Sequence, residues 1–348
     1  MNSDKDMTRE NQPLRYQDAG VDIEKGNEAV NRIRPWALKT ARKEVLSGVG
    51  GFAGAFELQE PSVLLAGADG VGSKLMIAEA LQQFDTIGID LVAMNVNDIL
   101  AQGGEPLFFL DYIATHQIVP EQIELLVKGI AQGCLESGCA LLGGETAELP
   151  DLYQPSHFDL AGFCVGRMVH KPKEPVQAGD QILGIASSGF HSNGYALLRR
   201  IVSERHLKWD QLYPVTGDQT LGQALLTPTR IYVKAVEDLW QKVSIKAMAH
   251  ITGGGLIENV PRTLPDDVIA VIDKSSWTMS ALMQWFQELG PVSDDEWYRT
   301  FNAGIGFTVV LAQSDVTLAQ SVLAQHGLAS YVIGHIEVGH GERGVKWA

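Results

Sequence analysis

The chain has little positive charge for its length. Its 348 residues carry 27 Lys and Arg against 42 Asp and Glu, which gives a formal net charge of −15. Broad binding to nucleic acid or to an anionic membrane surface depends on basic patches, so we expect neither kind of partner. A local basic pocket for a phosphorylated metabolite is compatible with this balance.

Cysteines and long apolar runs are also scarce. The three cysteines, Cys134, Cys139 and Cys164, form no CxxC pair and no even-numbered set, which indicates a reducing compartment. No apolar run is long enough to span a bilayer, and the N-terminus lacks the apolar core of a signal peptide. We therefore expect a cytoplasmic enzyme or binding protein.

The length predicts two domains of mixed α/β structure. Residues 1–15 are polar, and we expect them to be disordered. A segment with two prolines, 170–180, marks the expected boundary between an N-terminal domain (16–170) and a C-terminal domain (171–348). Apolar periodicity predicts helices over 36–46, 74–84, 87–104, 120–137 and 278–289, and strands over 62–68, 106–115, 140–148, 158–169, 268–273 and 304–312.

The octet GADGVGSK (67–74) comes close to a phosphate-binding P-loop, but its last two residues are transposed. Asp69 leaves a buried strand there, where a carboxylate is well placed to hold Mg²⁺. The flanking glycines, Gly70 and Gly72, let the backbone approach a phosphate closely. An ordinary Asp-Gly turn is the alternative, and the octet alone slightly favours it.

The helix predicted over 87–104 places polar residues beside its apolar face. Asn95 and Asp98 share one side with Leu91 and Gln102, next to an apolar stripe. A buried carboxylate needs a partner or a metal. A solvated Asp near the helix end explains this helix alone equally well.

Three further carboxylates fall in strands or glycine turns. Asp111 lies in a very apolar strand, where an unpaired charge is costly. Glu145 and Glu148 belong to GGETAE, which a surface turn would also explain. Together with Asp69 and Asp98, this pattern favours metal and nucleotide binding.

The C-terminal half contains two glycine turns that could bind an anion. In SSGFHSNGY (187–195), Ser192 and Asn193 precede a predicted helix whose free amides favour an anion, unless they are ordinary N-caps. The turn 253–255 follows His250, a residue that is more often structural than a ligand when it stands alone.

These motifs, in this order, resemble the phosphoribosylformylglycinamidine cyclo-ligase family, the aminoimidazole ribonucleotide synthetases. The similarity extends from about Tyr16 to the C-terminus and includes GVGGFAG (48–54), GADGVGSK, DTIGIDLVAMNVND (85–98), GGETAE, SSGFHSNGY, LTPTRIYVK (226–234) and HITGGGLIENVPR (250–262). One departure is Ser73, where the family often has threonine; both side chains carry a hydroxyl.

The resemblance implies a two-domain α/β subunit and a homodimer whose N-terminal sheets join across the interface. It implies that formylglycinamidine ribonucleotide and ATP give aminoimidazole ribonucleotide, ADP and phosphate in purine biosynthesis. ATP phosphorylates the formamide oxygen, the ribosylated amidine nitrogen attacks the formyl carbon, and phosphate leaves. Such a reaction needs alignment and charge neutralisation more than a strong nucleophile.

The resemblance also implies roles for individual residues. The expected Mg²⁺ ligands are Asp69, Asp98 and Glu145. The expected ATP-binding residues are Gly50, Gly51, Gly70, Gly72, Ser73, Lys74 and Asn95, with the loop 48–54 closing over the triphosphate. The expected substrate- or phosphate-binding residues are His191, Ser192, Asn193, Gly253, Gly254 and Gly255, with His250 and the three glycines lining the facing wall. The expected catalytic residues are Asp69, Lys74, Asp111 and His191, with Asp111 orienting the amidine.

Related families provide the alternatives. A selenophosphate synthetase would have a reactive cysteine near its N-terminus, and a hydrogenase maturation factor would have one at its C-terminus; this chain has neither. A thiamine monophosphate kinase stays open as the enzymatic alternative. A catalytically inactive nucleotide-binding scaffold is the other, although it would have no need to retain costly carboxylates.

Overall fold

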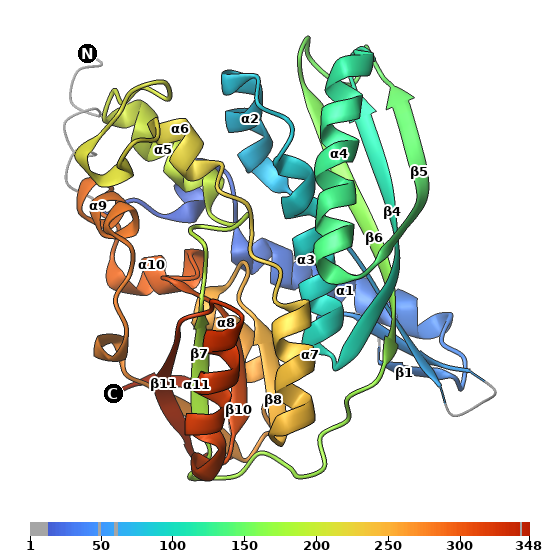
Figure 1. The fold of residues 1–348 in the computed structure, drawn as a ribbon, viewed down its shortest axis with the longest axis vertical. Coiled ribbons are helices and arrows are strands. Elements are labelled where there is room, and N and C mark those ends of the chain that lie inside the picture. The colour runs from blue at the N-terminus through green and yellow to red at the C-terminus, as the bar shows by residue number, and fades with distance from the viewer. Residues whose placement is uncertain (1–12, 48–49, 59–61, 342) are drawn as a thin grey trace.

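The computed structural model describes residues 13–47, 50–58, 62–341 and 343–348. The chain forms two six-stranded mixed sheets, one in each half, with helices packed against them (Figure 1). The expected mixed α/β class is confirmed. Within the described ranges, no helix is both long enough and apolar enough to cross a membrane.

The first sheet has the strand order β1-β2-β3-β6-β4-β5. Its elements, with the helices of this half, are α1 (Ile23–Lys39), β1 (Val45–Ser47), β2 (Gly54–Glu57), β3 (Val63–Gly70), α2 (Leu75–Leu81), α3 (Ile87–Ala101), β4 (Gly104–Thr115), α4 (Pro120–Ser137), β5 (Ala140–Glu148) and β6 (Phe158–Met168). The 3₁₀ turns η1 (Tyr16–Ala19) and η2 (Gly72–Lys74) precede α1 and α2.

The second sheet has the order β12-β9-β11-β7-β10-β8. The elements of this half are β7 (Gln181–Ala186), α5 (Tyr195–Glu204), α6 (Leu221–Leu225), α7 (Val233–Lys242), β8 (Ile245–His250), α8 (Gly255–Asn259), η4 (Val260–Thr263), β9 (Val268–Ile272), α9 (Ala281–Leu289), α10 (Asp294–Thr300), β10 (Ile305–Leu311), α11 (Val316–Gln325), β11 (Ser330–Val338) and β12 (Val345–Trp347).

Helix α3 is the central element of the molecule. All its residues except Ile89 and Asp98 are buried, because it packs on β3, β4 and β6 on one side and on β8 and α7 of the other half on the opposite side. A helix that is apolar nearly all round belongs in an interior. Its polar residues are therefore held at the junction between the two halves.

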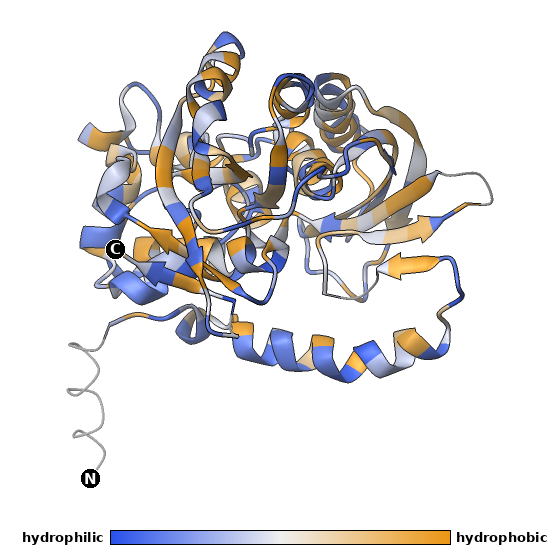
Figure 2. Ribbon diagram, turned by 90° about the horizontal axis from the view of Figure 1, so that it is seen from below, coloured by the Kyte–Doolittle hydropathy of each residue, from blue (hydrophilic) through white to orange (hydrophobic). Residues whose placement is uncertain are grey.

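The helix predicted over residues 36–46 is wrong. Helix α1 instead starts after Asp22, whose carboxylate caps the Lys25 amide at 3.1 Å, and it ends at Lys39. Val45 then begins β1, where a β-branched residue fits a strand. None of the residues of α1 is buried, and Figure 2 shows this helix along the edge of the molecule.

The first sheet has two different faces. Helices α3 and α4 pack on one face (Figure 1). Large apolar side chains remain exposed on the strands: Tyr112 is 41%, Leu142 64% and Phe163 40% exposed. Phe163 stands between buried residues of β6, and it pairs with Leu110, two residues before Tyr112, so both aromatic side chains lie on the face opposite the helices.

Glycines bring α3 and α4 unusually close, and this contact generates a stability prediction. A Cβ on Gly88 would lie 2.3 Å from the backbone nitrogen of Ile130, where no side chain fits. We expect Gly88→Ala to lower the free energy of unfolding by about 2–3 kcal/mol, because the helices must separate. Chemical denaturation measures the change.

The matched control is Gly26→Ala in α1, where a Cβ would meet nothing within 4 Å. This change should be neutral or stabilising by up to about 1 kcal/mol, since alanine is the better helix former. If both substitutions changed the free energy of unfolding equally, the close contact between α3 and α4 would not restrict the side chain at residue 88.

Candidate active site

Asp69 lies at the end of β3 beside α3. Its backbone oxygen accepts a hydrogen bond from the Asn95 side-chain amide at 3.3 Å. One side of Asp69 is open to solvent, but protein surrounds the carboxyl elsewhere. This burial and then the charge of Asp98 raise the pKa of Asp69 from 3.8 to about 6. The two carboxylates are therefore close enough to repel each other.

Asp98 is oriented by a histidine from the other half of the chain. The Nδ1 of His250, at the end of β8, lies 2.8 Å from the Asp98 Oδ1. The Asn97 oxygen accepts the Tyr232 amide at 3.0 Å, so the Asn97 nitrogen faces His250 Nε2, 3.5 Å away. The proton of a neutral His250 is thereby directed to Nδ1 and toward Asp98.

The structure brings Asp69, Asn95 and Asp98 together at the junction of the two halves. The Asn95 side-chain oxygen is buried and has no hydrogen-bond partner. Two carboxylates and a free amide oxygen are hard ligands of the kind that Mg²⁺ prefers, and Mg²⁺ usually completes its shell with waters and phosphates. The donor set therefore fits Mg²⁺, although no group of three or more His, Cys, Asp or Glu suited to a metal occurs among the described residues.

Asn193 and the glycine turn form the wall that faces this site. The Asn193 amide nitrogen lies 4.0 Å from the Met94 sulfur of α3, and a Cβ on Gly253 would lie 3.5 Å from the Asn193 oxygen. Gly254 has φ +93° and comes directly before α8. A Cβ on Gly255 would meet the Tyr298 oxygen at 2.0 Å, so this glycine serves close packing.

Lys74 does not face the site. Its side chain is fully buried, and its Nζ donates to Asp90 Oδ1 at 2.8 Å, His191 O at 3.0 Å and Thr227 O at 2.7 Å. An ammonium group has three protons to donate, and all are used within the protein. The resemblance implied that Lys74 neutralises a phosphate, but in this conformation it cannot. Its hydrogen bonds instead join the two halves of the chain.

Asp90 is the other centre of this buried network. Besides Lys74, its Oδ1 accepts hydrogen bonds from Ser192 Oγ at 3.0 Å, the Thr229 amide at 2.7 Å and Thr229 Oγ1 at 2.6 Å. Ser192 is therefore occupied inside the protein and is not available to a substrate phosphate. Neither Ser192 nor Asn193 caps α5, whose N-cap is Gly194.

His191 is also turned into the protein. The residue has φ +61°, its ring is 1% exposed, and its Nε2 accepts the Ser188 amide at 3.2 Å. Burial, followed by the positive charges nearby, holds its pKa well below 6.5, so the ring is neutral. In this conformation the ring contacts the protein on its buried side, and it shapes the loop that carries Asn193.

Sheet face and strand order separate Glu145 from Asp69, and two strand spacings separate Asp111 from it. Asp69 is level with Gly162 and Asp111, whereas Glu145 is level with Tyr112 on the opposite face. Three strand spacings, roughly 14 Å, separate β3 from β5. Within one subunit, Glu145 therefore does not reach the Asp69 and Asp98 pair, and Asp111 lies two strands away.

The glycine-rich segments flank the site. Gly70 ends β3, and Gly72 (φ +70°) and Ser73 belong to η2, next to Asp69. Gly50 and Gly51 are exposed before β2. Residues 48 and 49 of the loop expected to close over a triphosphate lie outside the described residues, as do residues 1–12 of the expected disordered N-terminus.

Sequence reasoning missed the polar residues that join the two halves. Asp90 and Asn97 are seven residues apart on α3 and thus share one side of the helix. This side meets Thr229, the Arg230 carbonyl and Tyr232. Two polar residues at helical spacing in an apolar helix were the available signal.

The Lys74–Asp90 pair generates a stability prediction. Lys74→Met should lower the free energy of unfolding by about 3–5 kcal/mol, because it leaves a buried carboxylate without its cation. Adding Asp90→Asn should recover part of that loss. Denaturation curves compare both variants with Lys128→Met, which changes an exposed lysine of α4; a Lys74→Met protein as stable as this control would contradict the network.

The raised pKa of Asp69 generates a pH prediction. The native carboxyl ionises less readily than the unfolded one, so stability falls as pH rises from about 4 to about 6. Without Mg²⁺ and ATP, Asp69→Asn should raise Tm by roughly 2 °C at pH 7.5, a value reduced to allow for solvent screening of this partly exposed carboxylate. Below pH 4 the substitution should not change Tm. Calorimetry with Asp151→Asn as the exposed control tests this; an effect that does not depend on pH would contradict it.

The two halves of the chain match the N-terminal and C-terminal domain models of one protein family. The model of the AIR synthase related protein N-terminal domain matches residues 50–168, and that of its C-terminal domain matches residues 177–346. A phosphoribosylformylglycinamidine cyclo-ligase from Anaeromyxobacter sp. (strain Fw109-5) is 51% identical, covering 94% of this chain and 97% of the relative. The enzyme of that name from Chromobacterium violaceum is 50% identical, covering 93% and 95%.

Solved structures share the fold at low sequence identity. A thiamine-monophosphate kinase from Stenotrophomonas maltophilia K279a has a TM-score of 0.60 at 20% identity, covering 91% of this chain and 95% of its own. A hydrogenase maturation protein HypE in complex with ATP has a TM-score of 0.59 at 15% identity, covering 85% and 84%. The chain belongs to the AIR synthase related family, as a member of its phosphoribosylformylglycinamidine cyclo-ligases.

Proposed function

We propose that the protein closes the imidazole ring of aminoimidazole ribonucleotide in purine biosynthesis. The reaction consumes formylglycinamidine ribonucleotide and ATP and releases ADP and phosphate. The observation that carries the proposal is the pair Asp69 and Asp98 at the junction of the two halves, where burial and then the charge of Asp98 raise the pKa of Asp69 to about 6. Proteins with this fold catalyse several reactions. We choose ring closure because the chain is about half identical to cyclo-ligases along nearly its full length.

Asp69 and Asp98 would hold Mg²⁺, and the free Asn95 oxygen could accept from one of its waters. Held there, Mg²⁺ would supply positive charge to offset that of the ATP phosphates. The carboxylates repel each other without a cation, so the site favours the loaded state. An ATP complex of a protein with this fold is consistent with nucleotide binding.

The remaining residues position the reactants. The Asp98 carboxylate is fixed by His250 at 2.8 Å, so its free oxygen keeps one direction. Asn193 is half-buried on the facing wall and offers an amide to the substrate. Because α3 carries Asp98 and touches the Asn193 loop, the formamide oxygen and the γ-phosphate can be aligned between the two halves.

Glu145 shares the exposed face of the first sheet with Tyr112, on the side opposite Asp69. The exposed face of the first sheet, with Tyr112, Leu142 and Phe163, provides an apolar surface on which two N-terminal sheets can join. We therefore propose a homodimer through this face. The free buried thiols are in keeping with a cytoplasmic enzyme.

An ADP-release assay tests the proposed reaction. The wild-type protein should release ADP in the presence of formylglycinamidine ribonucleotide and Mg²⁺, and none above background with thiamine monophosphate. Asp69→Asn and Asp98→Asn should each reduce turnover at least about 100-fold, because the metal loses a charged ligand.

Asp151→Asn is the control and should retain full turnover, and circular dichroism checks that all variants are folded. Release with thiamine monophosphate alone would favour the kinase alternative. Near-normal turnover of folded Asp69→Asn would reject the metal role.

A further inference from the structure

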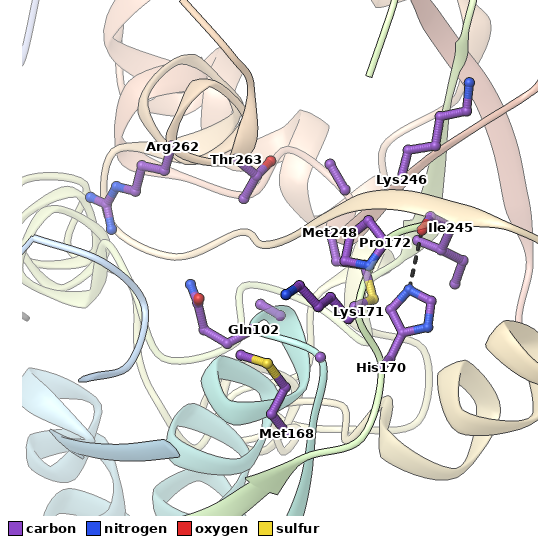
Figure 3. A pocket seen from close by; sticks show the side chains of 13 residues that line it. Gln102, Met168, His170, Lys171, Pro172, Ile245, Lys246, Met248, Arg262 and Thr263 are labelled. Atoms are coloured by element: carbon purple, nitrogen blue, oxygen red, sulfur yellow. Dashed lines mark hydrogen bonds between the residues drawn. The ribbon is translucent and has the colours of Figure 1, made fainter. Parts of the chain in front are cut away.

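A cavity of about 300 Å³ lies between the two halves of the chain (Figure 3). It is lined by the C-terminal end of α3, the segment that follows β6, strand β8 and the 3₁₀ turn η4. The cavity is large enough for a small organic molecule. None of the residues proposed to hold Mg²⁺ lines it.

Two cations at this cavity have no counterion. Lys171 and Arg262 are exposed and line the cavity, and neither forms an ion pair with any residue that the structure describes. Lys246, also in the lining, is paired with Asp180 at 2.7 Å and Glu174 at 3.7 Å. The lining includes no acidic side chain. In a chain of net charge −15, this is a local positive site.

Among the described residues, the Arg262 guanidinium forms no hydrogen bond, and an aromatic ring supports it. The Arg262 guanidinium lies 5.5 Å from the centre of the Phe52 ring, which supports it from one face. Its N–H groups point out in the plane of the group and stay free for a bidentate contact with an oxyanion. Phosphate and carboxylate groups have the matching geometry.

The rest of the lining suits an uncharged ring. Figure 3 shows the polar ends of Gln102 and Lys171 turned toward the hollow, with Arg262 at its rim, while the Thr263 hydroxyl donates to the Val260 carbonyl at 3.1 Å and can only accept a further hydrogen bond. Met168 and Met248 add flexible apolar surface. An amide and a hydroxyl can bind sugar hydroxyls, while the thioethers contact a ring face.

We propose that this cavity binds the phosphate monoester of a ribosyl compound. Arg262 and Lys171 hold the phosphate, Gln102 binds the sugar, Thr263 Oγ1 can accept from a sugar hydroxyl, and the methionines contact the apolar face of the sugar. Gln102 follows Asp98 by four residues, about 6 Å along α3. One molecule that carries such a group is the substrate itself, through its ribose 5-phosphate end; this identification rests on the proposed function. A free nucleotide is the other.

Isothermal titration of the full-length protein with ribose 5-phosphate tests the site without ATP or substrate. Saturable binding to the wild type is expected, with Kd raised about tenfold or more by Arg262→Ala and by Lys171→Ala. Lys173→Ala, an exposed lysine of the same segment outside the lining, should leave Kd unchanged. Absence of binding to the wild type, or binding that the first two changes leave unaltered in folded protein, would overturn the proposal.

Competition distinguishes the two sources. If formylglycinamidine ribonucleotide displaces ribose 5-phosphate, and Arg262→Ala raises KM with little change in kcat, the cavity binds the substrate. If ribose 5-phosphate binds the substrate-saturated protein unchanged, the cavity binds a separate nucleotide. Both results support the site. Because the titration requires no turnover, it can succeed even if the cyclo-ligase activity is absent.

Discussion

The relative position of the two halves of the chain depends on a buried ion pair of the first half, Lys74 and Asp90, whose further hydrogen bonds come from the second half. Lys74 and Asp90 come from the first half, and the groups that complete their coordination come from the second: the carbonyls of residues 191 and 227, Ser192 and Thr229. A buried ion pair must recover a large desolvation cost, and here it does so through these bonds. The relative position of the two halves is thereby defined by specific contacts.

The proposed chemistry follows from that junction. With α3 held against β8, His250 reaches Asp98 and the Asn193 loop reaches Met94. The site can then keep two mutually repelling carboxylates, a strain that a cation relieves. The same helix continues past Asp98 to Gln102 and the cavity lined by cations, so metal site and cavity share one rigid support.

Local patterns in the sequence predicted much of this arrangement. Apolar periodicity identified α3, α4 and the strands around them, and the resemblance to the cyclo-ligases implied that Asp69, Asn95 and Asp98 would belong to one site. The direction in which a side chain points was harder to predict from the sequence, because it depends on tertiary contacts. Lys74 follows the glycine turn as a phosphate ligand would, but a carboxylate 16 residues later on α3 draws it inward. Glu145 also seemed suitable in its motif, yet strand order and sheet face separate it from Asp69.

The central claim is that Asp69 and Asp98 form the metal site for ATP. Electron paramagnetic resonance of Mn²⁺, used in place of Mg²⁺, measures this directly in the presence of ATP. The account predicts one strong Mn²⁺–ATP site per subunit in the wild type, weakened at least about tenfold in Asp98→Asn and retained in Asp151→Asn. Unchanged Mn²⁺ binding by a folded protein with both Asp69→Asn and Asp98→Asn would contradict it.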